Sequence, residues 1–332
     1  VDAIIVSDPG VLTLAKKWAP EIPLHLSTQA NTTNSLSIAF WREQGIQRVN
    51  LARELTFAEL EEIRRDHDME LELFVHGAMC VSYSGRCLLS ALLNQRSANL
   101  GKCTQSCRWS YRLVEEKRPG QYFPICEDQN GTYIFNSKDL CLIEELDKLI
   151  GIGVNAFKIE GRMKGALYLS SVIRAYRQAI DRLWNSPEDY MVRRQWYEDL
   201  MRVSHRPYTK GLLFNDLQKH NHEVSRSTSY VQTHTLAGII RRNPESYWNR
   251  SVDRLNKVSG WVCMQVRSPL KKGALLEFLH PDGRTSCVTL DHFQDLRGNT
   301  LEMAHPNSWI RFPASLDVFP LQVVGTRRST PD

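Results

Sequence analysis

The chain has 332 residues, a hydrophobic content of 42% and a formal net charge of +5. A chain of this length can bury a substantial core and suggests about two domains. It contains no apolar run near the roughly 20 residues that cross a bilayer, which excludes a membrane-spanning helix within it. We therefore expect a cytoplasmic globular protein whose mild positive charge permits a nucleic-acid partner.

Strands and helices alternate through the first 77 residues. Residues 3–7 form a short apolar run typical of a buried strand, and Asp8 and Pro9 then provide a helix N-cap and a first helical position. The same order continues at residues 23–45, 48–68 and 70–77. This alternation predicts an α/β fold with a parallel sheet, as a TIM-type barrel or an open doubly wound sheet. A dinucleotide-binding fold loses support because no G-x-G-x-x-G follows a strand.

The middle of the chain interrupts and then resumes this pattern. Residues 109–137 contain two strand-like halves and a turn at Gln129–Gly131, which predicts a β excursion. We expect a helix at 139–149, a strand at 154–159 and a long amphipathic helix at 165–184. Counting only these strands gives about five barrel strands. Since the chain also starts without Met, we expect an N-terminally truncated (β/α) barrel.

The composition changes again towards the end of the chain. Residues 186–206 are helical in pattern and rich in Arg, Trp and Tyr, whereas short strands separated by Gly and Pro begin at residue 234. Such spacing predicts a small C-terminal β-barrel domain. The expected domains are a partial barrel with a cysteine-rich site, a helical connector and the β-barrel domain, at residues 1–185, 186–230 and 231–332.

Four of the eight cysteines lie between Glu72 and Cys107, and Cys141 follows. Clustered thiols in a chain of this kind suggest a metal or iron–sulfur site before disulfides. Gaps of six, fifteen and thirty-seven residues from Cys80 to Cys141 fit neither a zinc knuckle nor a ferredoxin run. A four-thiolate cluster supplied by loops remains, beside the alternative that these cysteines are small buried hydrophobic residues.

A long motif covers this region. From Glu72 to Ser90 the pattern E-x-F-x-x-G-A-M-C-x-x-x-x-G-x-C-x-L-S resembles the signature of the peptidase U32 (collagenase-like) family. The runs STQAN, LAREL, FNSKDLC and FKIEGRMK resemble a bacterial subgroup of that family. The resemblance implies a prephenate-dependent tRNA hydroxylase that oxidises the wobble uridine at carbon 5 and carries a [4Fe–4S] cluster. It also places three barrel strands before Val1 and a β domain at the C-terminus.

The resemblance also indicates which thiols bind the cluster. The expected ligands are Cys80, Cys87, Cys103 and Cys141. Cys107 is the alternative to Cys103, which is preferred because Gly101 lets the backbone approach a cluster closely and because its spacing resembles the family's. The other cysteines, in strand-like surroundings, are expected to be packing residues: Cys126, Cys263 and Cys287.

Polar residues gather where the predicted strands end, which is the active face of a strand–helix barrel. The candidate catalytic residues there are Arg53, Glu54, His76, Lys158, Glu160 and Arg162. A dicarboxylate such as prephenate calls for guanidinium or ammonium partners, which Arg53, Lys158 and Arg162 supply. Each residue also has a structural alternative, with Glu54 as a helix cap and His76 as a turn histidine.

Two other functions compete. A cysteine peptidase needs a thiolate paired with a histidine, for which Cys80 and His76 are candidates, while the H-E-x-x-H of a zinc peptidase is absent. A non-catalytic RNA-binding module is the third hypothesis, because aromatic and basic residues interleave at 108–112, 174–177 and 193–206. We expect tRNA on this basic helical surface, although the same pattern is typical of solvated helix faces.

Overall fold

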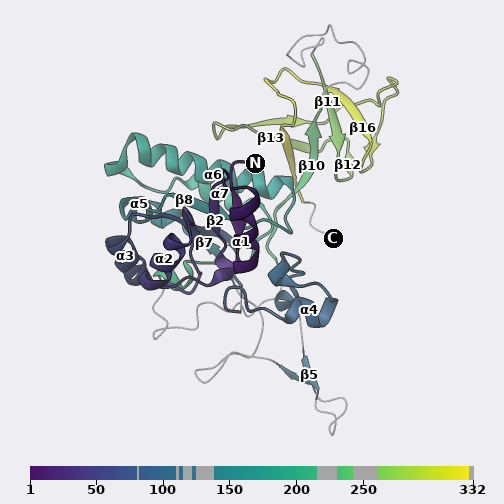
Figure 1. Ribbon diagram of the computed structural model, residues 1–332. Helices are drawn as coiled ribbons and strands as arrows, with labels where there is room; N and C mark the ends of the chain where they lie inside the picture. Colours follow the sequence, from purple (N-terminus) through teal and green to yellow (C-terminus); the bar gives the residue numbers. More distant parts are fainter. Residues whose placement is uncertain are drawn as a thin grey trace. The chain divides into compact units, whose positions relative to one another are not determined.

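A computed structural model describes residues 1–80, 82–109, 112–114, 122–124, 138–214, 230–241 and 260–328 (Figure 1). The chain forms two compact units, each made of two separate segments. The first unit comprises Val1–Glu160 and Arg206–Tyr230, and the second comprises Gly161–His205 and Val231–Asp332. Within the ranges given, no helix combines the length and the apolar character needed to cross a membrane.

The first unit is built on a mixed seven-stranded sheet in the order β1-β2-β3-β4-β7-β9, with β8 also paired to β4. Its strands are β1 Ile4–Val6, β2 Leu24–Leu26, β3 Arg48–Asn50, β4 Glu70–Ala78, β7 Asp139–Cys141, β8 Ala156–Ile159 and β9 Tyr208–Thr209. The first four strands are parallel neighbours, and β8 is parallel to β4. The predicted α/β fold with a parallel sheet is therefore confirmed, and among the described strands the sheet is open between β1 and β9.

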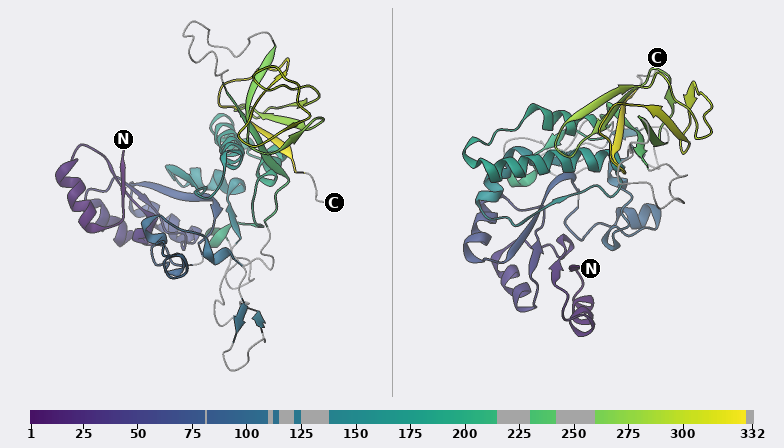
Figure 2. Two further views of the ribbon diagram at one scale, coloured as in Figure 1. Left: turned by 90° about the vertical axis from the view of Figure 1, so that its right-hand side faces the viewer. Right: turned by 90° about the horizontal axis from the view of Figure 1, so that it is seen from above.

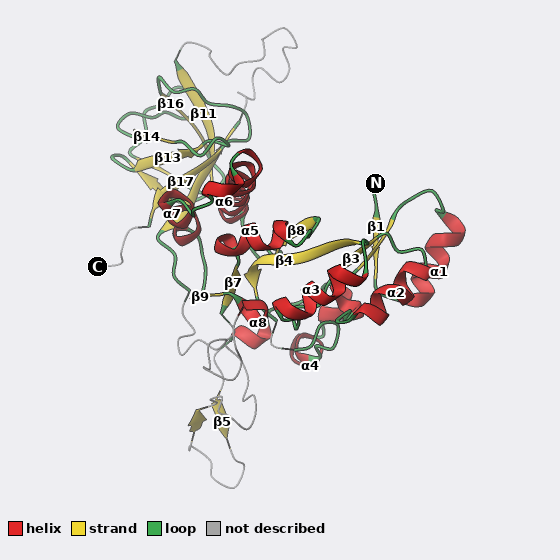
Figure 3. Ribbon diagram, turned by 90° about the vertical axis from the view of Figure 1, so that its left-hand side faces the viewer, coloured by secondary structure: helices red, strands yellow, loops and turns green. Residues whose placement is uncertain are grey.

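Three helices connect the parallel strands β1 to β4, namely α1 Pro9–Trp18, α2 Ser35–Glu43 and α3 Phe57–Asp66, and Figure 3 shows them along one side of the sheet. The first unit also contains α4 Leu89–Asn94, α5 Leu146–Gly151 and α8 Gly211–Phe214. The Asp8 carboxylate accepts a hydrogen bond from the Val11 N–H at 2.9 Å, so it caps α1 as predicted. Thr56 and Glu59 form a reciprocal capping box that starts α3.

The helix predicted at 139–149 is wrong in its first part. Asp139–Cys141 forms β7, which lies antiparallel to β4 and parallel to β9, and α5 begins only after the 3₁₀ turn η4, Ile143–Glu145. All three strand residues are buried, and β7 has a neighbouring strand at each edge. In the β excursion, β5 Arg112–Val114 pairs antiparallel with β6 Tyr122–Pro124, and the expected turn at Gln129–Gly131 lies outside the described residues.

The second unit combines two helices, α6 Ala166–Asn185 and α7 Arg194–Arg202, with the C-terminal antiparallel sheet (Figure 2). The sheet order is β14-β13-β17-β10-β11-β16, with a separate ribbon of β12 and β15. The strands are β10 His234–Ile240, β11 Trp261–Val266, β12 Leu270–Lys271, β13 Leu275–Leu279, β14 Thr285–Thr289, β15 Met303–Ala304, β16 Trp309–Pro313 and β17 Val323–Arg327. These strands confirm a β-rich C-terminal part. Phe278, Phe293 and Phe312 are buried in its core.

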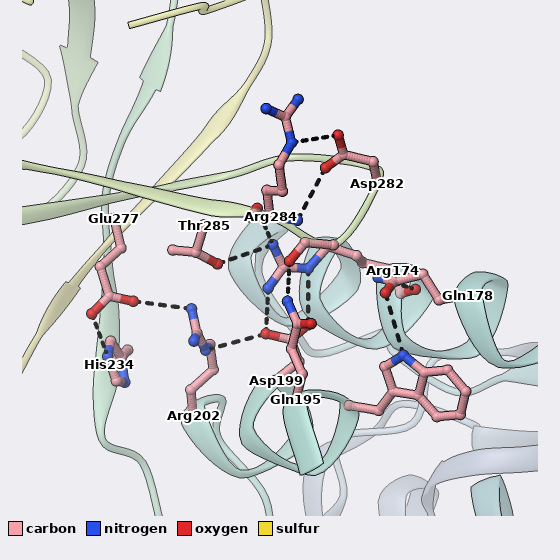
Figure 4. A network of polar contacts seen from close by, with 12 residues as sticks. Arg174, Gln178, Gln195, Asp199, Arg202, His234, Glu277, Asp282, Arg284 and Thr285 are labelled. Atoms are coloured by element: carbon pink, nitrogen blue, oxygen red, sulfur yellow. Dashed lines mark hydrogen bonds and ion pairs between the residues drawn. The ribbon is translucent and has the colours of Figure 1, made fainter. Parts of the chain in front are cut away.

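A buried ionic network joins α6 and α7 to this sheet (Figure 4). Arg174 of α6 pairs with both oxygens of Asp199 of α7, and Arg202 bonds Glu277 of β13 at 3.0 Å. His234 also bonds Glu277, at 3.1 Å. This hydrogen bond lowers the pKa of Glu277, with help from Arg202 and against the opposing effect of burial. Arg174 is thus a structural ion-pair residue rather than part of an RNA-binding surface.

Candidate functional site

The loop that carries the first two thiols begins where β4 ends and is fastened to the loop that follows β3. The Glu54 carboxylate accepts two hydrogen bonds from Ser84, one from the backbone N–H at 2.8 Å and one from the hydroxyl at 3.2 Å. Ser84 lies between Cys80 and Cys87 and is only 9% exposed. Glu54 therefore positions the thiol loop, while Thr56 caps the following helix.

Two glycines allow the close approaches that build this region. Gly85 has a φ of +77°, and a Cβ there would collide with the carbonyl of Gln29, in the turn η1, Thr28–Ala30. Gly77 has a φ of +107°, and a Cβ there would collide with the carbonyl of Glu160. Only glycine meets both requirements, a left-handed backbone and no side-chain volume. The thiol loop and the end of β4 thus pack directly onto the ends of β2 and β8.

The thiols are gathered in one region but are not arranged as a closed ligand set. Desolvation of its sulfur and the nearby thiols of Cys87 and Cys103 raise the pKa of Cys80 above its usual value. The backbone of Ser82 and the charge of Arg53 oppose this rise. Across the residues that the structure describes, no group of three or more His, Cys, Asp and Glu side chains is placed to hold a metal ion.

Beyond Cys87, a small polar network holds the rest of the thiol segment together. The hydroxyl of Ser90, in α4, bonds the hydroxyl and the N–H of Thr104, both at 3.0 Å. Asn94 donates to the hydroxyls of Thr104 and Ser106 at 3.1 and 2.9 Å. Two short turns complete the segment, η2 Ala98–Leu100 and η3 Ser106–Arg108. Cys103 sits within this network, where its sulfur accepts the Gln105 N–H at 3.3 Å.

Two of the predicted cations meet at one aromatic ring. The Arg53 guanidinium carbon lies 3.9 Å from the centroid of the Phe74 ring, and the Lys158 ammonium lies 5.5 Å from it. Lys158 also pairs with Glu72 at 2.7 Å. Arg53 donates to the carbonyl of Ala78 at 3.2 Å. Arg53 and Lys158 therefore lie together, as expected from their positions at strand ends. The Phe74 ring between them was not among the predicted site residues.

A hollow of about 320 Å³, including open solvent, adjoins this arginine. Its walls are mostly apolar and carry two cationic side chains, Arg53 and Lys210. Lys210 is paired with Glu144 and Glu145 at 2.8 and 2.6 Å, which raises the pKa of its ammonium group.

The remaining candidates occupy different surroundings. His76 is buried in β4, with its ring 5.3 Å from that of Tyr208, and its Cα pairs in register with that of Cys141. Glu160 is half-buried and its N–H donates to the His76 carbonyl at 2.8 Å. Arg162 is exposed and belongs to the second unit. The structure thus places His76, Cys141 and Glu160 around the end of β4.

Comparison with known proteins matches this architecture to one family. The description "Peptidase family U32" fits residues 1–223, and the "Peptidase family U32 C-terminal domain" fits residues 251–323. The chain belongs to peptidase family U32. Among its U32 relatives, the tRNA hydroxylation protein P of Escherichia coli is 34% identical over 96% of this chain and 76% of its own length. The tRNA hydroxylation protein P1 of Bacillus subtilis is 33% identical over 96% of this chain and 73% of its own length.

The U32 family also includes relatives with other names. The collagenase of Porphyromonas gingivalis is 37% identical over 64% of this chain and 52% of its own length. Family membership therefore does not by itself decide between RNA modification and proteolysis.

Residues of the U32 signature contact three of the other runs that resemble the family, namely STQAN, LAREL and FKIEGRMK. Glu72 and Phe74 contact Lys158 of FKIEGRMK, and Gly85 lies against Gln29 of STQAN. The LAREL run supplies Arg53 to the Phe74 ring and Glu54 to Ser84. The motif is thus the contact surface on which three strand ends assemble around the thiol loop.

The thiols themselves suit an iron–sulfur cluster by their chemistry, since soft thiolates are the donors such clusters use. Cys80, Cys87, Cys103, Cys107 and Cys141 are not in disulfides, and Cys141 is buried. Cys103 is one of the thiols that raise the pKa of Cys80, and its preference over Cys107 as a ligand stays a prediction. Of the cysteines expected to pack, Cys263 is half-buried and Cys287 is exposed, while Cys126 is outside the described residues.

Proposed function

We propose that this U32 protein hydroxylates tRNA at carbon 5 of the wobble uridine, with prephenate as co-substrate and a [4Fe–4S] cluster as cofactor. The observation that carries the proposal is the similarity of nearly the whole chain to the tRNA hydroxylation protein P of Escherichia coli. An iron–sulfur cluster supplies one-electron redox chemistry when it is bound.

Cys80, Cys87, Cys103 and Cys141 are the thiolates that would hold the cluster. The first three lie on the segment that the Glu54–Ser84 contact and the Ser90–Thr104 network hold in place. Cys141 comes from β7, which pairs with the end of β4 only a few residues before Cys80. Glu54 acts in this proposal by positioning the loop through Ser84.

The proposed co-substrate site is the mostly apolar hollow that Arg53 and Phe74 line, with Lys158 beside the same ring. A cyclic dicarboxylate matches this arrangement because its carboxylates pair with Arg53 and Lys158 while its ring packs on an apolar surface. Glu72 already neutralises part of the Lys158 charge. Arg162, His76 and Glu160 remain candidates for contact with the substrates.

The test is nucleoside mass spectrometry of tRNA from cells with and without the gene. Loss of 5-hydroxyuridine and its derivatives on deletion, and its return with the wild-type gene but not with Cys80→Ser, supports the proposal. Unchanged nucleosides on deletion would refute it.

Proteolysis is the second candidate, because of the similarity to the Porphyromonas gingivalis collagenase. A thiol peptidase would need Cys80 activated by His76, yet Cys80 has a raised pKa and His76 is only 1% exposed. Cleavage of denatured collagen by the pure protein, lost in Cys80→Ser, would favour proteolysis over hydroxylation.

A further inference from the structure

We propose that the exposed side chains of residues 82–109 bind the single-stranded anticodon loop of the tRNA. This inference rests on the proposed function and adds the place at which the RNA is held. It assigns RNA contact to the thiol segment itself, and not to the helices α6 and α7 that composition suggested.

The charge of this part of the chain favours an anionic ligand. Residues 73–114 contain no Asp or Glu, although the chain has 37 acidic residues in 332, and they contain five Arg or Lys. At the average frequency, a stretch of this length would hold four or five acidic residues. We call residues 73–114 the acid-free segment. A segment with five cations and no carboxylate of its own favours a polyanion, because phosphate contacts gain from nearby cations and none is opposed by an acidic residue of the segment.

Three cations of the acid-free segment are available to a ligand. Arg86, Arg96 and Lys102 are exposed, and within the described residues none of them forms an ion pair. Two exposed arginines of α6 and α7 differ in this respect. Arg177 pairs with Asp181 at 2.6 Å and Arg194 pairs with Glu198 at 2.8 Å. An arginine already paired with a carboxylate gains less from a phosphate, so the acid-free segment is the stronger anion site.

The acid-free segment also exposes aromatic and apolar side chains. Tyr83 is 67% exposed and Trp109 is 47% exposed. Exposed aromatic rings beside cations are how proteins hold unpaired bases, through stacking on the ring and contacts to phosphate. Four leucines of the segment are also exposed and extend this apolar surface: Leu88, Leu92, Leu93 and Leu100. Apolar exposure on this scale marks an interaction site, and the absence of acidic residues indicates RNA as the partner.

The acid-free segment includes the thiol loop and is held to the rest of its unit by hydrogen bonds. Tyr83 lies between Cys80 and Cys87, so a base stacked on its ring is held next to the thiol loop. The segment is fixed to the rest of its unit, since Ser84 bonds Glu54 and the Gln29 side chain donates to the Ala98 carbonyl at 3.4 Å. A supported surface loses less conformational entropy on binding than a loose loop.

The test compares two triple charge reversals in the full-length, cluster-loaded protein. The test variant is Arg86→Glu, Arg96→Glu and Lys102→Glu. The control variant makes the same change in net charge at exposed positions outside the segment: Lys16→Glu, Lys17→Glu and Arg193→Glu. Binding of a fluorescent RNA hairpin with the anticodon stem and loop is measured by anisotropy over a range of salt concentrations. Iron content and circular dichroism establish that both variants are folded and loaded.

The test variant should bind at least about 30-fold more weakly, and the slope of log affinity against log salt should fall by about 2, for three lost phosphate contacts. The control variant should stay within about threefold of wild type, because its charges lie off the site. Tyr83→Ala should weaken binding by about tenfold through lost stacking, with little change in salt slope.

If the test variant binds RNA no more weakly than the control, the inference is wrong. The proposed function survives that result as long as wild-type protein restores 5-hydroxyuridine to tRNA in deletion cells. If RNA affinity is unchanged while the test variant alters the oligomeric state in sedimentation, the surface is a protein interface and the inference is also overturned.

Discussion

Glu54 offers the sharpest test of how the thiol loop is held. Glu54→Ala removes both hydrogen bonds to Ser84 and leaves a nearly buried N–H without its acceptor. Hydrogen bonds to charged groups contribute about 1.5–3 kcal/mol each. Since Glu54 is half-buried and one bond is 3.2 Å long, the expected loss for the pair is about 2 kcal/mol. Opening of the loop should then become about 30-fold more frequent.

Amide hydrogen exchange at Ser84, measured in cluster-free protein, reports this opening directly. Glu54→Gln keeps a neutral acceptor and should accelerate exchange by about fivefold, for a loss of about 1 kcal/mol. Glu61→Ala removes an exposed carboxylate from α3 and serves as the control. If exchange in Glu54→Ala matches that in Glu61→Ala, the carboxylate does not hold the loop, and its contact with Ser84 contributes nothing measurable.

Three further outcomes follow from the contacts described above. Cys103→Ser should bleach the visible absorption of anaerobic protein and remove its iron, whereas Cys107→Ser should retain both; the reverse result would exchange the two ligands. Arg53→Ala should raise the prephenate concentration needed for half-maximal tRNA hydroxylation by about 30-fold or more, since a charge-assisted pair is lost, with unchanged iron content as the check on folding. Because the pKa of Glu277 is lowered in the folded state, its carboxylate stabilises the second unit fully above the unfolded-state pKa, about 4.3, and that stability is lost as pH falls through the lower folded value. The melting temperature should therefore decline across this acidic window, and Glu277→Gln should flatten the decline; an unchanged pH profile would show that the pair with His234 is energetically neutral.

Helix caps and the order of strands and helices could be predicted from the sequence, because they depend on residues that are close together in the chain. Asp8 and Pro9 predict the start of α1 because a helix cap is adjacent to its helix. The alternation of strands and helices up to β4 can be predicted from hydrophobic periodicity alone. The segment Asp139–Cys141 could not be assigned in this way. Its apolar run suits either a helix or a strand, and its strand conformation comes from pairing with β4 and β9, which are distant in sequence.

The site shows the same division. Strand-end position brought Arg53 and Lys158 forward as candidates, because strand ends converge in any parallel sheet. The partners that define their roles were not predictable, since Lys158 meets Glu72 across 86 residues and Glu54 meets Ser84 across 30 residues. A signal for these pairs existed in the motif, where Glu72 stands at a fixed position with no evident role until its cationic partner is in place.

The last strand of the first sheet has a consequence for how the chain folds during synthesis. β9 begins at Tyr208 and pairs with β7, which begins at Asp139, so this edge of β7 stays open until nearly 70 more residues have been made. At typical translation rates of about 5–20 residues per second, the delay is roughly 3–14 seconds. In the meantime the helices α6 and α7 emerge without the C-terminal sheet that completes their own unit. The nascent chain therefore exposes an unpaired strand edge together with the apolar faces of two helices that the C-terminal sheet has not yet covered. Exposed surface of this kind is what chaperones at the ribosome bind.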